Sequence, residues 1–242
     1  MYHEFSVVDT IKASWHIFKK NFVTIIVFSV IAFILLAIIE GVVFYFTSIE
    51  DFWTGMALEL VLVFAQSYTT LGLYKLFFTL IDSEYYEFEF RQVLPHIRMI
   101  ISYITVVLIL ASLSVSFSIL LEHLDDYPVL HDIIEIGGII VALYLILRIM
   151  FFITFIVDDR SGPLESLKQS FELTYGYMLK ILAILGIIVL LIAIPALLSY
   201  YSAFFSLIIM FTYPFVNIIL AETYRKLVYS HKDVDDDVSE TL

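Results

Sequence analysis

Residues 143–159 read LYLILRIMFFITFIVDD, an apolar run that contains one arginine, Arg148, and ends in Asp158 and Asp159. A helix of about 20 apolar residues crosses roughly 30 Å of hydrocarbon, and this run belongs to a segment of that length. A charged side chain inside such a span is costly to insert, and it is usually functional or paired with other polar groups. The segment therefore predicts a membrane span and singles out Arg148.

The composition of the whole chain extends this interpretation. Of 242 residues, 61% are hydrophobic and 17% aromatic, and the mean hydropathy is +0.96. A single water-soluble core does not bury so much apolar surface, so we expect a polytopic membrane protein. No segment alternates like a lipid-facing strand, so the predicted fold is all-α with six transmembrane helices. The six apolar windows cover residues 22–46, 55–80, 99–121, 134–157, 178–198 and 203–224.

The basic residues predict the orientation. The connections 47–54, 122–133 and 199–202 contain no Lys or Arg. Twelve of the thirteen basic residues lie on the other side of the predicted spans, and Arg148 is the thirteenth. The positive-inside rule then predicts a multi-pass protein of the bacterial cytoplasmic membrane with both termini in the cytoplasm.

Amphipathic helices precede three of the spans. Apolar residues recur every three or four positions before the first span (Val8, Ile11, Trp15, Phe18, Phe22), before the fifth (Leu164, Leu167, Phe171, Tyr175, Met178) and, more weakly, before the third (Phe90, Leu94, Ile97, Ile101). Residues 1–230 are therefore predicted to form one domain of three parallel units, about 1–81, 82–157 and 158–230, each an interfacial helix followed by two spans. Alternatively, the three segments are not repeats, because any helix that enters a membrane from the cytoplasm has this pattern. The acidic residues 231–242 are predicted to be a disordered tail.

After Asp158 and Asp159 the chain continues SGPLESLKQSFELTYGYMLKIL over residues 161–182. This order resembles the membrane domains that precede some bacterial glycerophosphodiester phosphodiesterases, and the related stand-alone membrane proteins of the YciC type. The matching residues are Arg148, Asp158 or Asp159, Gly162, Leu167, Ser170, Leu173, Thr174, Pro214, Tyr224 and Arg225. The resemblance implies a six-helix membrane domain. It implies no catalysis, because the residues after 225 are too few to form the phosphodiesterase barrel.

Arg148 has two interpretations. It lies nine residues before Val157, roughly 13 Å from the cytoplasmic edge of a straight span. Polar residues are predicted at the same depth in other spans: Gln66, Ser67, Thr69, Thr70, Ser112, Ser114, Thr212 and Asn217, with Pro214 releasing the Met210 carbonyl. Arg148 either ties the spans together by donating hydrogen bonds into this polar belt, or it holds an anionic group such as a lipid phosphate. The sequence favours the first interpretation.

No other pattern in the sequence predicts a metal, catalytic or nucleic-acid site. The segment 121–132 offers possible metal ligands at His123, Asp125, Asp126, His131 and Asp132, but their spacing matches no metal motif, and we expect no metal or cofactor. No catalytic motif and no basic patch for nucleic acid occurs. We therefore expect a non-enzymatic protein that engages lipid, another membrane protein or a second copy through its interfacial helices and the grooves between its spans. The alternatives are a small transporter of a solute or amphiphile that uses the polar belt, and a lipid-acting enzyme that uses the outer acidic segment.

Overall fold

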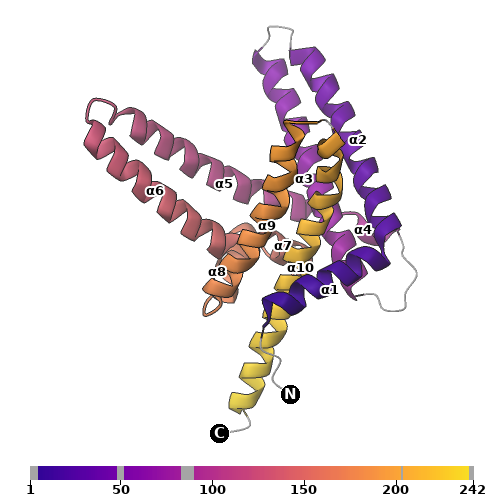
Figure 1. Ribbon diagram of the computed structural model, residues 1–242. Coiled ribbons are helices and arrows are strands. Elements are labelled where there is room, and N and C mark those ends of the chain that lie inside the picture. The colour runs from indigo at the N-terminus through magenta and orange to yellow at the C-terminus, as the bar shows by residue number, and fades with distance from the viewer. Residues whose placement is uncertain (1–4, 48–51, 83–89, 203, 240–242) are drawn as a thin grey trace.

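The computed structural model describes residues 5–47, 52–82, 90–202 and 204–239, which form ten helices and their connections, without a strand (Figure 1). This confirms the all-α fold. The helices are α1 (Val7–Lys20), α2 (Phe22–Thr47), α3 (Phe52–Asp82), α4 (Phe90–Val93), α5 (Ile97–Glu122), α6 (Pro128–Ile149), α7 (Phe152–Asp158), α8 (Pro163–Leu173), α9 (Met178–Ser199) and α10 (Phe204–Ser239).

The described residues contain five segments long and apolar enough to cross a membrane: Phe22–Phe46, Trp53–Asp82, Ile97–Glu122, Pro128–Asp158 and Met178–Ser199. The chain is therefore a polytopic membrane protein. The predicted sixth span, 203–224, coincides with the first half of α10, although residue 203 lies outside the described residues.

Helix α10 is longer than the sequence predicts. It continues through residues 231–239, where the acidic composition predicts a disordered tail. No Gly or Pro follows Pro214 in this helix, so no residue that commonly stops a helix occurs there. Residues 240–242 of the predicted tail lie outside the described residues.

Short helices precede three of the spans, as the periodicity predicts. Helices α1 and α8 have 14 and 11 residues, whereas α4 has only 4 because Pro95 follows it and disfavours helical backbone in the residue before. Helix α4 packs on α3 and helix α8 on α7, so each of these two contacts the span that precedes it in the chain. Helix α1, which no span precedes, packs on the last helix, α10. This arrangement is compatible with three repeated units, which stay a prediction.

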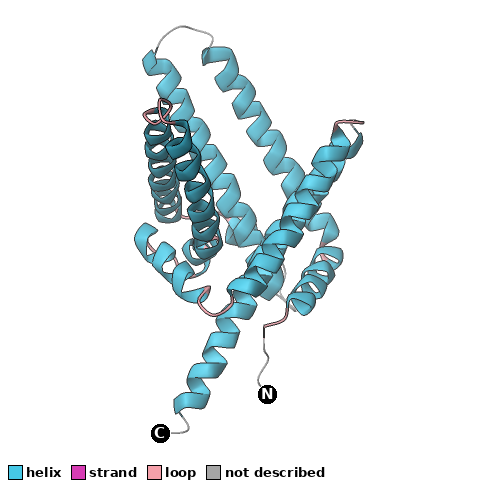
Figure 2. Cartoon of the chain, turned by 60° about the vertical axis from the view of Figure 1, so that its left-hand side comes forward, coloured by secondary structure: helices cyan, strands magenta, loops and turns pink. Residues whose placement is uncertain are grey.

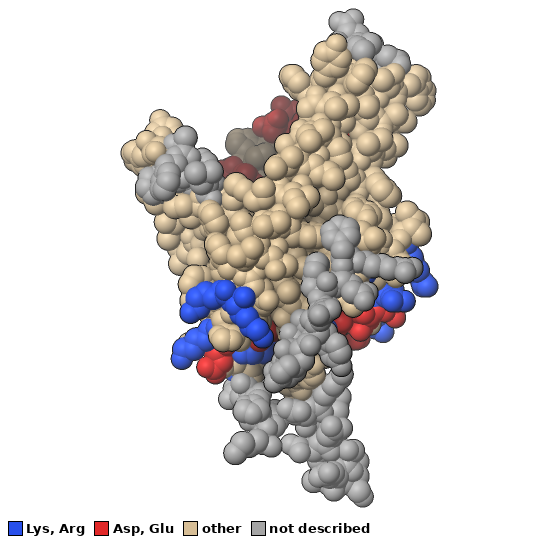
Figure 3. Space-filling view, turned by 90° about the vertical axis from the view of Figure 1, so that its right-hand side faces the viewer, with Lys and Arg blue, Asp and Glu red and all other residues tan. Residues whose placement is uncertain are grey.

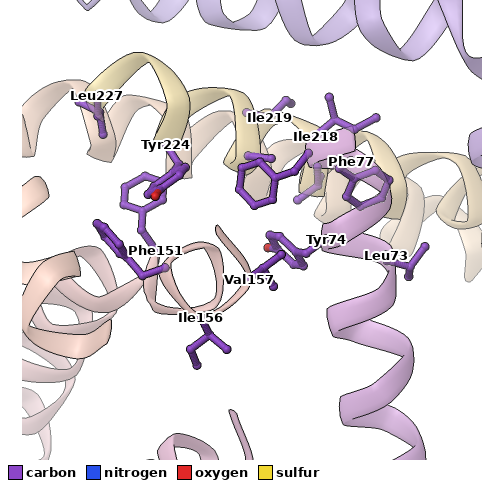
Figure 4. Packing of buried hydrophobic residues seen from close by; sticks show 14 of the residues in the cluster. Leu73, Tyr74, Phe77, Phe151, Ile156, Val157, Ile218, Ile219, Tyr224 and Leu227 are labelled. Atoms are coloured by element: carbon purple, nitrogen blue, oxygen red, sulfur yellow. The ribbon is translucent and has the colours of Figure 1, made fainter. Parts of the chain in front are cut away.

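The main core lies between α3, α7 and α10 (Figure 4). These three helices contribute large side chains that are buried almost completely: Leu73, Tyr74 and Phe77 from α3, Ile156 and Val157 from α7 with Phe151 just before it, and Ile218, Ile219, Tyr224 and Leu227 from α10. Apolar packing of this density fixes the relative positions of the three helices. It also positions the charged residues at their ends.

Two helical hairpins extend from this core. Helices α2 and α3 pack along each other, and the α5–α6 hairpin leans away from them, as Figures 1 and 2 show. Most side chains of the outer half of the α5–α6 hairpin are exposed in the isolated chain, as expected for residues that face lipid. Within this hairpin the ring of Phe117 lies against Gly138 so closely that a Cβ at Gly138 would collide with the Phe117 Cζ atom.

The lysine and arginine side chains gather at one end of the molecule, whereas acidic residues also lie at the α5–α6 connection. We call this end, which comprises α1, α4, α7, α8 and the C-terminal half of α10, the basic end. Figure 3 shows Lys and Arg side chains there, below a broad surface on which no Lys or Arg is seen. Helix α1 begins and α10 ends at this end, and the α5–α6 connection lies at the opposite end (Figures 1 and 2).

Candidate functional site

The fourth predicted span is broken just after Arg148. Helix α6 ends at Ile149 and α7 begins at Phe152. The Ser170 hydroxyl of α8 fills the break, because it donates to the Arg148 carbonyl at 2.8 Å and accepts from the Phe151 amide at 3.2 Å. The sequence does not predict this break, since residues 143–157 contain neither Gly nor Pro.

The break places the Arg148 side chain against α8. Its guanidinium carbon lies 4.8 Å from the centroid of the Phe171 ring and 6.0 Å from that of Tyr175. We call these three residues the Arg148 slot. Arg148 is only 9% exposed, and its Nε has no hydrogen-bond acceptor. No carboxylate of the described residues forms an ion pair with it, and an uncompensated buried charge is unfavourable.

The predicted polar belt does not assemble around Arg148. Gln66 and Ser112 are exposed, and the hydroxyls of Ser112 and Thr212 donate to carbonyls of their own helices at 2.8 and 2.9 Å. Asn217 likewise donates to the Tyr213 carbonyl at 2.8 Å. Arg148 lies in the last turn of α6, where its side chain meets Phe171 of α8.

The other members of the belt lie elsewhere in the molecule. Thr70, together with Thr69 and Tyr213, lines a small cavity of about 30 Å³ between α2, α3 and α10. Pro214 lies inside α10. A cavity of this size has room for about one or two water molecules, so it is too small for a larger solute.

A second charged cluster joins three helices at the basic end. Arg225 of α10 donates through Nη1 to Asp158 at 2.8 Å and through Nη2 to Asp82 at 2.5 Å, and the Tyr224 hydroxyl donates to the same Asp158 oxygen at 2.9 Å. We call these four residues the Arg225 clamp. Burial opposes the charge on Arg225, but Asp158 and Asp82 outweigh that effect and raise its pKa. Sequence reasoning missed Asp82, whose only signal is its place at the end of a span.

The residues that carry the resemblance thus divide between the two sites. Asp158, Tyr224 and Arg225 belong to the Arg225 clamp, and Ser170 supports the Arg148 slot. Gly162 is the N-cap of α8, where its amide donates to the Glu165 carboxylate at 3.1 Å. Further along α8 lie Thr174, which is buried and donates to the Ser170 carbonyl, and Leu167, which is half-buried against the core.

Helices α1 and α8 bury their hydroxyl faces. Thr10 and Ser14 of α1 and Ser166 and Ser170 of α8 are fully buried. The predicted apolar stripes are divided: Val8 is 60% exposed and Leu164 69%, whereas Phe18 is buried in the core and Ile11 and Leu167 are half-buried against it. Small side chains let the helix backbones approach the neighbouring span closely, and Val8 and Leu164 remain outside.

The acidic segment between α5 and α6 brings some of its polar residues together. His131 lies 3.6 Å from Asp125, 3.7 Å from Asp132 and 4.0 Å from Glu135. The ligand atoms of His131, Asp132 and Glu135 lie within 4.8 Å of one another, but the acids are exposed, and such groups are common without a metal. His123 lies near the Ile119 carbonyl, and Asp126 is outside this group.

Comparison of the chain with known protein families, with curated proteins and with solved structures found no match.

Proposed function

We propose that this protein is a non-enzymatic component of the cytoplasmic membrane that engages lipid through α1 and α8. One observation carries the proposal: both helices bury a face of small hydroxyl residues and expose the large apolar residues Val8 and Leu164. Exposed apolar residues on a short helix beside membrane spans favour a helix that lies in the lipid interface.

The charges on these helices support the same proposal. Lys12, Lys19 and Lys20 on α1 and Lys168 on α8 stand beside the exposed apolar residues. Lysines at this level attract the anionic lipids of the cytoplasmic leaflet, each by about 1 kcal/mol near the surface. The basic end then faces the cytoplasm, with both termini on that side, in accordance with the positive-inside rule.

The hydroxyl groups of the spans favour this function over transport. The hydroxyls of Ser67, Ser112 and Thr212 donate to carbonyls of their own helices, so they need no solute as a partner. The resemblance to the membrane domains of bacterial glycerophosphodiester phosphodiesterases stays part of the proposal. It is supported by the contacts among Asp158, Tyr224 and Arg225, which match residues of that pattern.

Tryptophan fluorescence in vesicles tests the proposal. The chain has two tryptophans, and Trp15 on α1 is partly exposed. In a Trp53→Phe variant, we expect lipids brominated close to the headgroup to quench Trp15 more strongly than lipids brominated at the end of the acyl chain. For α8, Leu164→Trp in a chain without other tryptophans should be quenched in the same way, and Glu172→Trp on the polar face should not. Quenching of Trp15 and of Leu164→Trp by aqueous iodide alone would refute the proposal.

A further inference from the structure

We infer that the Arg148 slot binds a phosphate group, and that the phosphate belongs to an anionic phospholipid. The inference rests on the proposed function, because it requires α8 to lie at the level of the lipid headgroups. It concerns a specific site, however, whereas the proposed function concerns two helix faces. The two therefore fail in different experiments.

A comparison of Arg148 with Arg225 supports the phosphate site. The Arg225 guanidinium lies 4.8 Å from the Phe78 ring, the same distance that separates Arg148 from Phe171. Arg225 donates to two carboxylates, whereas Arg148 forms no ion pair with any described carboxylate. The Nε atoms of both arginines are buried without an acceptor, so the contrast lies in the carboxylates alone. A guanidinium buried this far requires an anion, and its planar fork of donors matches phosphate oxygens.

Specific contacts hold the Arg148 slot in place. Ser170 bonds the backbone on both sides of the break, at the Arg148 carbonyl and the Phe151 amide, and so fixes the position from which the Arg148 side chain leaves α6. The next residue, Phe171, supplies the ring beneath the guanidinium. Cation–π contact holds the planar group in place without using its hydrogen-bond donors. Those donors remain available to a ligand.

The slot also opens in the direction from which a headgroup would come. Tyr175, which forms its outer side, is 76% exposed. Two residues later Tyr177 is the N-cap of α9, after Gly176 turns the chain with a φ of +83°. The first amides of a helix have no partner within the helix, so positive potential develops three residues after Tyr175 along the chain. Leu164 on the same helix α8 faces outward, which places the slot at the lipid surface.

Native mass spectrometry of the full chain, released from nanodiscs of phosphatidylglycerol and phosphatidylcholine, tests the inference. We expect the native chain to retain phosphatidylglycerol, and Arg148→Leu to bind it about tenfold or more weakly, since a lost charge-assisted hydrogen bond has at least that effect. Arg148→Lys should retain an intermediate amount, because lysine keeps the charge without the fork. Phe171→Leu should also weaken binding, because it removes the ring but little apolar volume.

Lys168→Gln is the matched control. Lys168 lies on the same helix, 77% of its side chain is exposed, and it pairs with Glu172 at 3.8 Å. Its loss removes one positive charge without touching the slot, so retention of phosphatidylglycerol should change less than about twofold. Equal losses in Lys168→Gln and Arg148→Leu would overturn the inference, because they would show only general attraction to anionic lipid.

Further measurements distinguish a lipid phosphate from free phosphate, and further variants replace Arg148→Leu if it does not fold. If inorganic phosphate protects the native chain from thermal unfolding and protects Arg148→Leu less, while no lipid is retained, the phosphate site stands and the lipid source is wrong. If Arg148→Leu does not fold, Arg148→Lys and Phe171→Leu decide the result. Unchanged retention in both would overturn the site. If retention is unchanged but Trp15 is quenched by brominated lipid, the inference fails and the proposed function stands.

Discussion

The Arg225 Nη1 atom donates to the Asp158 carboxylate at 2.8 Å, which ties α10 to the end of α7 across 67 positions of the sequence. Through Nη2 the same guanidinium reaches Asp82 at the end of α3. The three helices that form the main core are therefore joined by one charged group where the core meets the basic end. This relationship and three others lead to testable predictions.

Replacing Asp158 by asparagine should lower the melting temperature. The variant removes the charge of the carboxylate that accepts from both Arg225 and Tyr224. The side chains of Asp158 and Arg225 are both largely buried. We expect a loss of about 1–2 kcal/mol, because Arg225 keeps its contact with Asp82. Glu172→Gln removes the exposed partner of Lys168 and should change stability by less than about 0.5 kcal/mol. Similar thermal unfolding of both variants in one detergent would contradict the prediction.

Replacing Ser170 by alanine should destabilise the break between α6 and α7. The Phe151 amide loses its acceptor and the Arg148 carbonyl loses a donor, both at buried positions. An unsatisfied buried group costs about 1–3 kcal/mol. Ser112→Ala removes a hydroxyl that bonds only within α5 and is exposed, so its effect on thermal unfolding should be small. An unchanged melting temperature for Ser170→Ala would show that the hydroxyl is not needed.

Alanine should be tolerated at Gly137 and not at Gly138. A Cβ at Gly138 would collide with the Phe117 ring, whereas a Cβ at Gly137 meets nothing within 4 Å. We expect Gly138→Ala to lower stability by about 1–3 kcal/mol, as overpacking does, and Gly137→Ala to leave it unchanged or raise it slightly. Thermal unfolding of the two variants in the same detergent gives the comparison. A Gly138→Ala chain as stable as Gly137→Ala would mean that Phe117 moves away at no cost.

Single cysteines should reveal the orientation, since the native chain contains none. An impermeant maleimide applied to intact cells should label Asp126→Cys and Ser199→Cys, which lie in the connections without Lys or Arg. His16→Cys on α1 and Lys168→Cys on α8 should be labelled only after the membrane is permeabilised. Labelling of Lys168→Cys in intact cells would reverse the proposed orientation.

The sequence alone determined the helical segments. Hydropathy is a local property of each window, so the first five predicted spans agree with the apolar helices within a few residues in most cases. The exception is the fourth, which begins at Pro128 rather than near residue 134. The beginning of α8 also follows from local chemistry, because Pro163 occupies the first helical position and Glu165 caps the Gly162 amide.

The tertiary structure alone decided which faces and ends meet. Lipid and protein core are both apolar, so hydropathy does not tell which side of α8 is buried, and there the hydroxyls of Ser166 and Ser170 face the protein. The contact between Arg225 and Asp82 joins residues 143 positions apart, and no local pattern encodes it. Arg148 shows the same limit. The sequence showed that a charge at this position is costly to insert into a membrane. Only the packing of α8 across the broken span placed its side chain on Phe171, because that contact depends on where two separate helices meet.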